Sequence, residues 1–304
     1  MTCVSHTVQQ EVMMIDTAQA FGVDIGGSGI KAAPVDLNKG EFAEPRLKIL
    51  TPSESTPQAI GSVLRKQLEH FEVPETAPVG ISFPAPVKPG QKLNWIANLD
   101  QSWVGVDITE ALSEECGRPV TVVNDADAAG LAEQQFGAAK GQEGLVVVTT
   151  LGTGIGTALI YDGVLIPNTE LGHIELEGGK GDAERYASSA VRERKELSYK
   201  KWAKRLTKYY SLIEKYFSPS LIVIGGGVSR KSDNFVPFID IDTPIVPAKL
   251  RNEAGIIGAP TTPAPSSAES TGAYIRTPHL GRPSSRQCRT HGRGRVVACV
   301  FLPE

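Results

Sequence analysis

The sequence is poor in cysteine and contains no long apolar run. Its four cysteines, at positions 3, 116, 288 and 299, include no CxxC pair, which excludes a disulfide framework and a zinc finger. No apolar stretch reaches the roughly 18 residues that a membrane span requires, and residues 1–20 lack the pattern of a secretion signal. We therefore expect a cytoplasmic protein without a membrane partner.

Basic residues do not dominate the chain either. Its 304 residues carry 31 Lys and Arg against 34 Asp and Glu, a net charge of −3. Residues 260–304 hold six Arg and two acidic residues, which leaves a net charge of −7 on residues 1–259. Such a body is not a general nucleic-acid binder, so we expect no nucleic-acid partner and expect any anion to be bound locally.

What is present is an alternation of strand-like and helix-like segments. Residues 57–71 and the stretch after Asn124 have helical spacing. Short apolar runs bounded by Gly, Pro or Asn predict strands at 21–25, 30–35, 79–83, 120–123, 145–151, 155–161 and 221–224. This alternation predicts an α/β architecture.

The length of the chain favours two domains. We expect a flexible leader at 1–20, a small α/β domain at 21–123, a larger α/β domain at 124–259 and, from its Pro- and Arg-rich composition, a disordered tail at 260–304.

Two glycine-rich turns lie about 125 residues apart in the sequence, and each joins two consecutive predicted strands. Each turn can place backbone N–H groups against phosphate oxygens. A tight β-turn is the alternative for either one alone. Neither turn fits the dinucleotide-binding GxGxxG pattern or the P-loop. Asp24, before the first turn, suits the neighbourhood of a Mg²⁺ carried by phosphate. The candidate phosphate-binding residues are Gly26, Gly27, Ser28, Lys31, Gly152, Thr153 and Gly154.

A third glycine cluster follows the strand at 221–224. An apolar strand that ends in Gly225, Gly226 and Gly227 can receive a nucleotide or the far part of another phosphate donor.

Polar side chains follow the strand at 120–123, where open α/β sheets bind ligands. Asp125 is placed to act as a base that takes the proton from an attacking hydroxyl. The alternative is structural, with Asn124 or Asp125 capping the next helix. We assign Asp127 to the first turn of that helix.

Further polar residues are spaced irregularly, as a polyhydroxylated ligand would require: Asn98, Glu170, His173 and Glu184. A structural role is the alternative for the lone His173. A zinc site is not expected, because no second His or Cys lies at ligand spacing.

The motifs DIGGSGIK, NDADAAG, TLGTGIG, ELGH and GGGVS occur in this order between residues 24 and 229. In this order and spacing they resemble the ROK family of sugar kinases and sugar-responsive repressors. The segments around Val191–Arg194 and 243–248 resemble its subgroup of polyphosphate-using glucokinases. The resemblance covers about residues 21–259. Both the zinc motif common in the family and the helix-turn-helix of its repressors are missing from the sequence.

This resemblance implies an actin-like fold (hexokinase, Hsp70 ATPase and ribonuclease H-like) with the substrates in a cleft between two α/β domains. It implies phosphoryl transfer with Mg²⁺ from polyphosphate, with ATP as a further candidate donor, to the 6-hydroxyl of glucose. It makes Asp125 the catalytic base and gives the glucose hydroxyls to Asn98, Asn124, Glu170, His173 and Glu184. We also expect a homodimer.

The segment from Arg185 to Lys208 is the one strongly basic stretch of the body, with nine basic and two acidic residues. Its apolar positions recur at helical spacing, so an ordinary solvated helix is the alternative to a track for a long polyanion. The track residues would be Arg192, Arg194, Lys195, Lys200, Lys201, Lys204 and Arg205. An ATP-only glucokinase and a non-catalytic sugar sensor are the rival functions.

Overall fold

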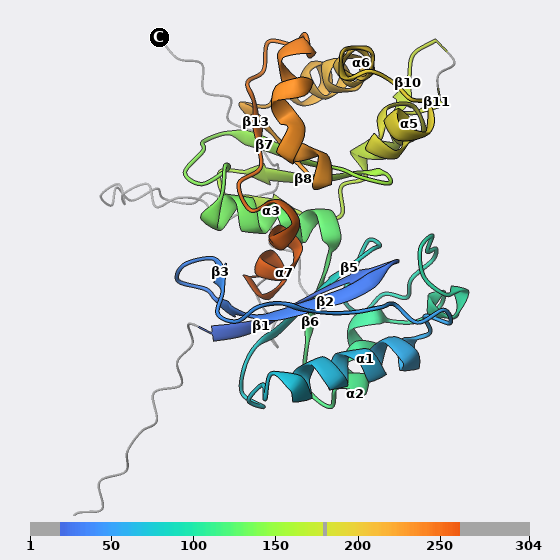
Figure 1. Cartoon of the computed structure of the whole chain (residues 1–304), viewed down its shortest axis with the longest axis vertical. Helices are drawn as coiled ribbons and strands as arrows, with labels where there is room; N and C mark the ends of the chain where they lie inside the picture. Colours follow the sequence, from blue (N-terminus) through green and yellow to red (C-terminus); the bar gives the residue numbers. More distant parts are fainter. Residues whose placement is uncertain (1–18, 179–180, 262–304) are drawn as a thin grey trace, which may run out of the picture. The chain divides into compact units, whose positions relative to one another are not determined.

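The computed structural model describes residues 19–178 and 181–261. Figure 1 shows two sheets with helices α3 (Asp125–Phe136) and α7 (Ala254–Gly258) between them. No helix in the described ranges combines the length and apolarity that a bilayer crossing requires. Residues 1–18 of the predicted leader (1–20) and residues 262–304 of the predicted tail (260–304) lie outside the described residues.

The first sheet has the order β3-β2-β1-β5-β6, and β4 also pairs with β2. β1 and β2 form an antiparallel hairpin, whereas β1, β5 and β6 run parallel. The strands are β1 Gln19–Gly26, β2 Gly29–Asp36, β3 Glu41–Phe42, β4 Leu47–Ile49, β5 Val79–Phe83 and β6 Thr121–Asn124.

The second sheet repeats this plan with the order β9-β8-β7-β12-β13. β7 and β8 form the antiparallel hairpin, and β12 and β13 extend the sheet in parallel. The strands are β7 Leu145–Leu151, β8 Ile155–Tyr161, β9 Val164–Ile166, β12 Leu221–Gly225 and β13 Ile245–Pro247. The seven predicted strands all lie in these two sheets.

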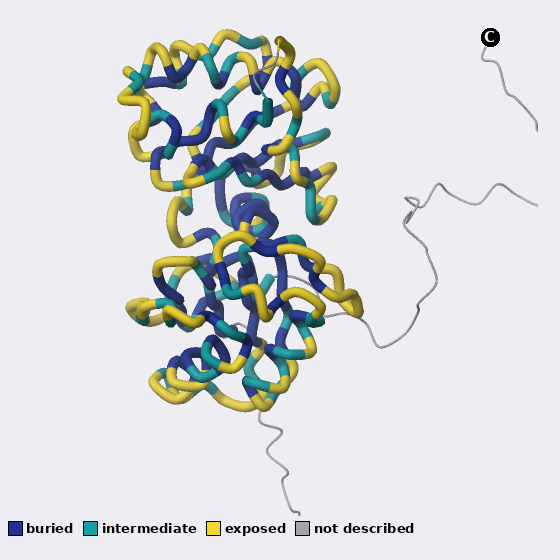
Figure 2. Tube along the Cα trace, turned by 90° about the vertical axis from the view of Figure 1, so that its right-hand side faces the viewer, coloured by how far each residue is buried: buried dark blue, intermediate teal, exposed yellow. Residues whose placement is uncertain are grey.

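Helices cover both faces of each sheet. The first sheet packs on α1 (Pro57–His70) and α2 (Ile108–Cys116) through one apolar cluster, and on α3 and α7 through another. The second packs on α3 and, on its other face, on α6 (Tyr199–Phe217). Figure 2 shows the buried residues in the interior of the trace and the exposed ones at its periphery.

The remaining elements are short and lie mostly in loops. They are η1 Gln101–Trp103, η2 Leu171–His173, β10 Glu175–Leu176, β11 Gly181–Asp182, α4 Ala183–Ala187, α5 Ser189–Arg194, η3 Gly227–Asn234, η4 Val236–Phe238, η5 Arg251–Glu253 and η6 Ala259–Thr261. β10 and β11 pair as a two-stranded sheet.

Two boundaries differ from the predicted ones. β1 begins at Gln19, within the predicted leader, because Gln19 and Ala20 pair with Asp36 and Val35. η6 reaches Thr261, within the predicted tail. A Cβ on Gly80 would lie 2.2 Å from the nitrogen of Pro260, so the end of the described chain packs tightly on β5. The division into domains at residues 123 and 124 stays a prediction.

Candidate functional site

A cavity of about 410 Å³ collects most of the predicted site residues, a volume within the usual range for small-ligand sites. Both glycine turns, the start of α3 and the segment around η2 line it. The predicted residues among its lining are Asp24, Gly26, Gly27, Asn98, Asn124, Asp125, Gly152, Thr153, Gly154, Glu170, His173, Glu184 and Gly226.

Asp125 is the first residue of α3, directly after β6. Asn124 is the N-cap, because its Oδ1 accepts hydrogen bonds from the N–H groups of Ala126 (2.9 Å) and Asp127 (3.3 Å). The structural alternative therefore holds for Asn124, whose side chain nevertheless lines the cavity. Capping by Asn124 directs the carboxylate of Asp125 to the cleft, where Asp125 is exposed.

The pKa of Asp125 is raised to about 6. Desolvation by the surrounding protein is the main cause, and the nearby charge of Asp24 adds to it. A carboxylate with a pKa near neutrality is suited to accept a proton and later release it.

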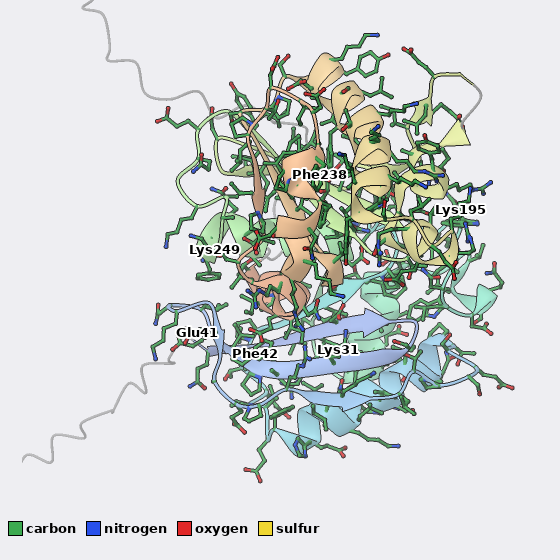
Figure 3. All side chains as sticks on the ribbon, turned by 45° about the horizontal axis from the view of Figure 1, so that its top comes forward. Lys31, Glu41, Phe42, Lys195, Phe238 and Lys249 are labelled. Atoms are coloured by element: carbon green, nitrogen blue, oxygen red, sulfur yellow. The ribbon has the colours of Figure 1, made fainter. Side chains whose placement is uncertain are left out.

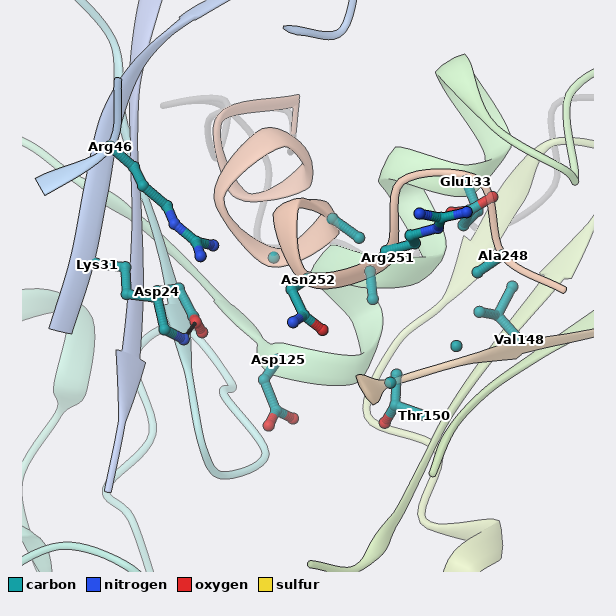
Figure 4. A pocket seen from close by; sticks show the side chains of 15 residues that line it. Asp24, Lys31, Arg46, Asp125, Glu133, Val148, Thr150, Ala248, Arg251 and Asn252 are labelled. Carbon is teal, nitrogen blue, oxygen red and sulfur yellow. Dashed lines mark hydrogen bonds and ion pairs between the residues drawn. The ribbon is translucent and has the colours of Figure 1, made fainter. Parts of the chain in front are cut away.

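Asp24 and Lys31 face each other across the β1–β2 hairpin. Lys31 Nζ lies 2.7 Å from Asp24 Oδ2, and Ser82 donates a hydrogen bond to Asp24 Oδ1 at 3.4 Å. In Figure 4, which shows a neighbouring cavity, Asp125 lies between Asp24 on one side and Thr150, from β7, on the other. The hairpin therefore brings a paired carboxylate and ammonium to the space beside Asp125.

A positive φ does not account for the glycines of the two turns. Gly26 pairs with Gly29, which leaves a two-residue turn, and Leu151 pairs with Ile155, which leaves three residues. Among the predicted glycines only Gly226, with φ 80°, lies in the left-handed region. At Gly154 the reason is close packing, since a Cβ there would lie 2.1 Å from Glu184 Oε2.

The glycine at position 152 is different, because a Cβ there would meet nothing within 4 Å. Its backbone faces open space at the wall of the cavity. The turn can therefore admit a bulky anion at this point.

Acidic side chains surround His173, which lines the same cavity as Asp125. His173 Nδ1 lies 2.7 Å from Asp182 Oδ2, and its Nε2 lies 3.8 Å from Glu170 Oε2. The hydrogen bond to Asp182 is the main cause of the raised pKa of His173. Burial raises the pKa of Glu170.

Asp182 was not predicted. It caps α4 by accepting from the N–H of Glu184 at 2.8 Å, and it also holds His173. Glu184 Oε2 in turn accepts the N–H of Ile155 at 3.0 Å, next to the second turn. The N-cap position before Ala183 is a sequence signal for Asp182, but its contact with His173 depends on the fold.

Asn168 joins the two halves of the site. Its side chain accepts from the N–H of Val87 (2.7 Å) and donates to the carbonyl of Val87 (2.9 Å), after β5. Its own N–H donates to Asp127 Oδ2 at 2.7 Å. Asp127 is buried, and desolvation raises its pKa to about 7. Asp127 lies in the first turn of α3, as predicted, and it also anchors the segment that leads to Glu170.

Other predicted residues lie around this cavity rather than in it. Lys31 and Gly225 line the neighbouring cavity of Figure 4, together with Arg46 and Asn252. Gly227 and Arg192 line a third cavity, which shares Gly152 and Thr153 with the first. Ser28 is exposed at the tip of its turn.

The basic segment is divided among α4, α5 and α6, which corrects the expectation of one basic helix. Its apolar face on α6 is confirmed, since Trp202, Leu206, Tyr209 and Ile213 are all fully buried. Arg194, Lys195, Lys200, Lys201 and Lys204 are exposed, and Figure 3 shows Lys195 beside these helices.

Three of the predicted track residues lie over aromatic rings, and one of them is Lys200, whose Nζ lies 5.6 Å from the ring centre of Phe238. The guanidinium of Arg192 lies 4.6 Å from the ring centre of Tyr199. That of Arg205 lies 4.6 Å from the ring centre of Tyr186 and donates to its carbonyl at 2.9 Å. Arg192 and Arg205 are half-buried, so the exposed charge lies on the five other residues.

Comparison with known proteins shows which family this chain resembles. The family model described as ROK family matches residues 20–187. A polyphosphate glucokinase of Mycobacterium tuberculosis (strain CDC 1551 / Oshkosh) is 47% identical over 240 residues, which are 79% of this chain and 89% of that protein.

Solved structures agree. The inorganic polyphosphate/ATP-glucomannokinase from Arthrobacter sp. strain KM superposes with a TM-score of 0.75 at 45% identity, covering 80% of this chain and 97% of that one. A ROK family glucokinase from Streptomyces griseus, in complex with glucose and AMPPNP, has a TM-score of 0.67 at 24% identity, covering 80% and 98%. The latter likeness speaks for the fold alone.

The repeated strand order and these neighbours confirm the expected actin-like α/β fold. With the family model over more than half of the chain and a relative at 47% identity, the protein is a member of the ROK family.

Proposed function

We propose that this protein transfers a phosphoryl group from inorganic polyphosphate to the 6-hydroxyl of glucose, giving glucose 6-phosphate, and that ATP also serves as a donor. The observation that carries the proposal is that Asp125 shares one cavity with both glycine turns and with the polar residues around His173. The names of the relatives at 45–47% identity support the same reaction.

In this mechanism Asp125 accepts the proton of the sugar hydroxyl as its oxygen attacks phosphorus, and the bond from phosphorus to the bridging oxygen of the donor breaks. Asn98, Asn124, Glu170, His173 and Glu184 would hold the other hydroxyls and so fix the attacking oxygen. The N–H groups of the two glycine turns would bind the phosphate oxygens. Positioning and charge neutralisation would provide most of the rate, with proton transfer adding about 10²–10⁴-fold.

A divalent cation fits this site as a companion of the donor. The described residues contain no group of three or more His, Cys, Asp or Glu side chains that could hold a metal alone. Mg²⁺ commonly binds through one or two carboxylates together with substrate phosphates, and Asp24 is the carboxylate that would face it. The ion would neutralise charge on the transferring phosphoryl group.

The donor end of the site favours a long polyanion. The third cavity leads from Gly152 and Thr153 to Arg192 and Lys231, and the exposed lysines of α6 follow along the chain. A polyphosphate chain would gain from neutralisation of its charges along such a path, whereas the short triphosphate of ATP would reach only the beginning of the path.

We also propose that the protein is a homodimer and that it acts in the cytoplasm.

The decisive experiment supplies the purified protein with glucose and Mg²⁺ together with either polyphosphate or ATP, and measures glucose 6-phosphate. We expect product with both donors. Product from ATP alone would make the protein an ATP-only glucokinase. Glucose binding without product would make it a sugar sensor.

Asp125→Asn tests the proposed base. It should lower kcat by about 10²–10⁴-fold while calorimetry still detects glucose binding, because the amide cannot accept the proton. Asp233→Asn, at an exposed position in η3, is the matched control and should leave kcat unchanged. An Asp125→Asn variant with unchanged kcat would refute the assignment.

A further inference from the structure

We propose that Trp95 is a sugar-binding residue whose indole ring covers the C–H face of the hexose. The inference rests on the proposed function. It assigns a role to a residue that none of the motifs contains.

Trp95 occupies the wall of the cavity that holds Asp125, Asn98 and Glu170. Its exposed fraction is 62%, although the other two tryptophans, Trp103 and Trp202, are fully buried. Within the described residues, no hydrogen bond of its indole N–H and no partner of its ring is found. Trp103 and Trp202, in contrast, each donate an indole N–H to a backbone carbonyl at 2.8 Å.

The exposure of Trp95 is not the result of a loose loop. Leu93, Ile96 and Leu99, on both sides of it, are buried in the core of the first sheet. Leu93 exchanges backbone hydrogen bonds with Val106 and Gly105, and the side chain of Gln101 holds the carbonyl of Ile96. The loop therefore holds the indole out of the core at the wall of the cavity.

The chemistry of the indole ring selects a sugar over a phosphate chain. The face of an aromatic ring carries negative charge, so it attracts the positively polarised C–H groups of a hexose and repels phosphate oxygens. Its N–H can donate to a ring or hydroxyl oxygen. The same cavity supplies acceptors for hydroxyl groups from Glu170 and Glu184, so an apolar surface and polar groups converge, as in other small-ligand sites.

Trp95 also lines a second cavity. Together with Pro86 it borders both the sugar-side cavity and a smaller one of about 200 Å³, whose lining includes Leu93 and Ile108. Trp95 therefore lies at the edge that the two cavities share.

Steady-state kinetics test the inference. Trp95→Ala should raise the glucose KM by about 10- to 100-fold, the range expected for loss of a buried aromatic contact, with less than a twofold change in the polyphosphate KM. Trp95→Phe should lie between Trp95→Ala and the wild type. Tyr161→Ala, which removes another exposed aromatic side chain outside this cavity, is the matched control and should change neither KM.

Tryptophan fluorescence gives a readout independent of turnover. Because the chain has three tryptophans and the other two are buried, acrylamide should quench chiefly Trp95, and glucose should protect it. The glucose-dependent protection should vanish in Trp95→Phe. Protection by polyphosphate and not by glucose, or an unchanged glucose KM in Trp95→Ala, would overturn the inference. A wild-type protein that neither binds nor phosphorylates glucose would instead overturn the proposed function.

Discussion

The two sheets share one strand order but differ in what their hairpins carry. In the first, β1 and β2 bring the ion pair of Asp24 and Lys31 to the cleft. In the second, β7, β8 and their turn bring no charged side chain to the cavity, which they line with Thr150, Thr153, Ile155, Thr157 and glycines. The charged residues Glu170, His173 and Glu184 follow after β9, around η2 and in α4.

This difference indicates that the two halves of the fold contribute different groups to the site. Thr149 is fully buried and its hydroxyl lies 2.8 Å from the hydroxyl of Tyr210 in α6, so this part of β7 serves packing. Asp24 is half-buried and faces two cavities. The repeated plan therefore supplies two glycine turns, while the ion pair of Asp24 and Lys31 comes from the first hairpin alone.

Among variants that compare the two hairpins, the largest effect is expected from removing the negative charge of Asp24. Asp24→Asn should lower kcat by about 10²–10³-fold, since it removes the carboxylate that pairs with Lys31 and would face Mg²⁺. Thr150→Val, at the facing position of the second sheet, should cost about tenfold or less. Steady-state kinetics with polyphosphate would compare them. Equal losses in the two variants would contradict the division of work.

The packing of α7 against β1 gives the next prediction. A Cβ on Gly22 in β1 would lie 1.9 Å from the carbonyl oxygen of Ile256 in α7. Gly22→Ala should therefore lower the free energy of unfolding by about 3 kcal/mol, measured by denaturant titration. Gly152→Ala is the matched control, because its Cβ meets open space. It should keep the stability and weaken the use of polyphosphate. A stable Gly22→Ala variant would show that α7 can move.

The pH dependence of kcat should reflect the pKa of Asp125. A base works only when ionised, so a pKa raised to about 6 moves the acidic decline of kcat up from the ordinary range near 4. Below pH 6, kcat should fall about tenfold per pH unit. Because the charge of Asp24 contributes to the shift, the decline in Asp24→Asn should move to lower pH. A decline at the same pH would argue that another group controls the rate.

The smallest and most selective effect is expected on the outer surface of the second half. Reversal of the exposed Lys200, Lys201 and Lys204 to Glu should raise the KM for polyphosphate by about tenfold and weaken its salt dependence, with little effect on ATP. Equal losses with both donors would remove the case for a track along α6.

Much of the fold could be predicted from the sequence, because strand and helix signals are local. The runs 79–83, 145–151 and 155–161 are strands with the predicted bounds. The helix after Ser55-Thr56-Pro57 begins at Pro57, where Thr56 accepts the N–H of Ala59. The pairing of the strands and the repeated sheet are long-range properties and needed the structure.

For the site, motif order predicted which residues share a cavity. It could not predict partners brought together only by folding, such as Asp182 with His173, or Asn168 with Val87. Trp95 belongs to no motif, and only its exposure at the cavity wall distinguishes it from a core residue. The extent of the basic helix was also wrong, because Ser188 and Ser198 cap separate helices within the basic run.

The return of α7 and η6 to β1 and β5 has a consequence for biosynthesis. Gly22 and Gly80, in the first sheet, receive the backbone of Ile256 and Pro260, which the ribosome adds 180 or more residues later. The half translated first therefore stays incomplete until residues 254–261 emerge. A premature stop codon a few residues before Ala254 would harm the amino-terminal sheet more than the nearby carboxyl-terminal one.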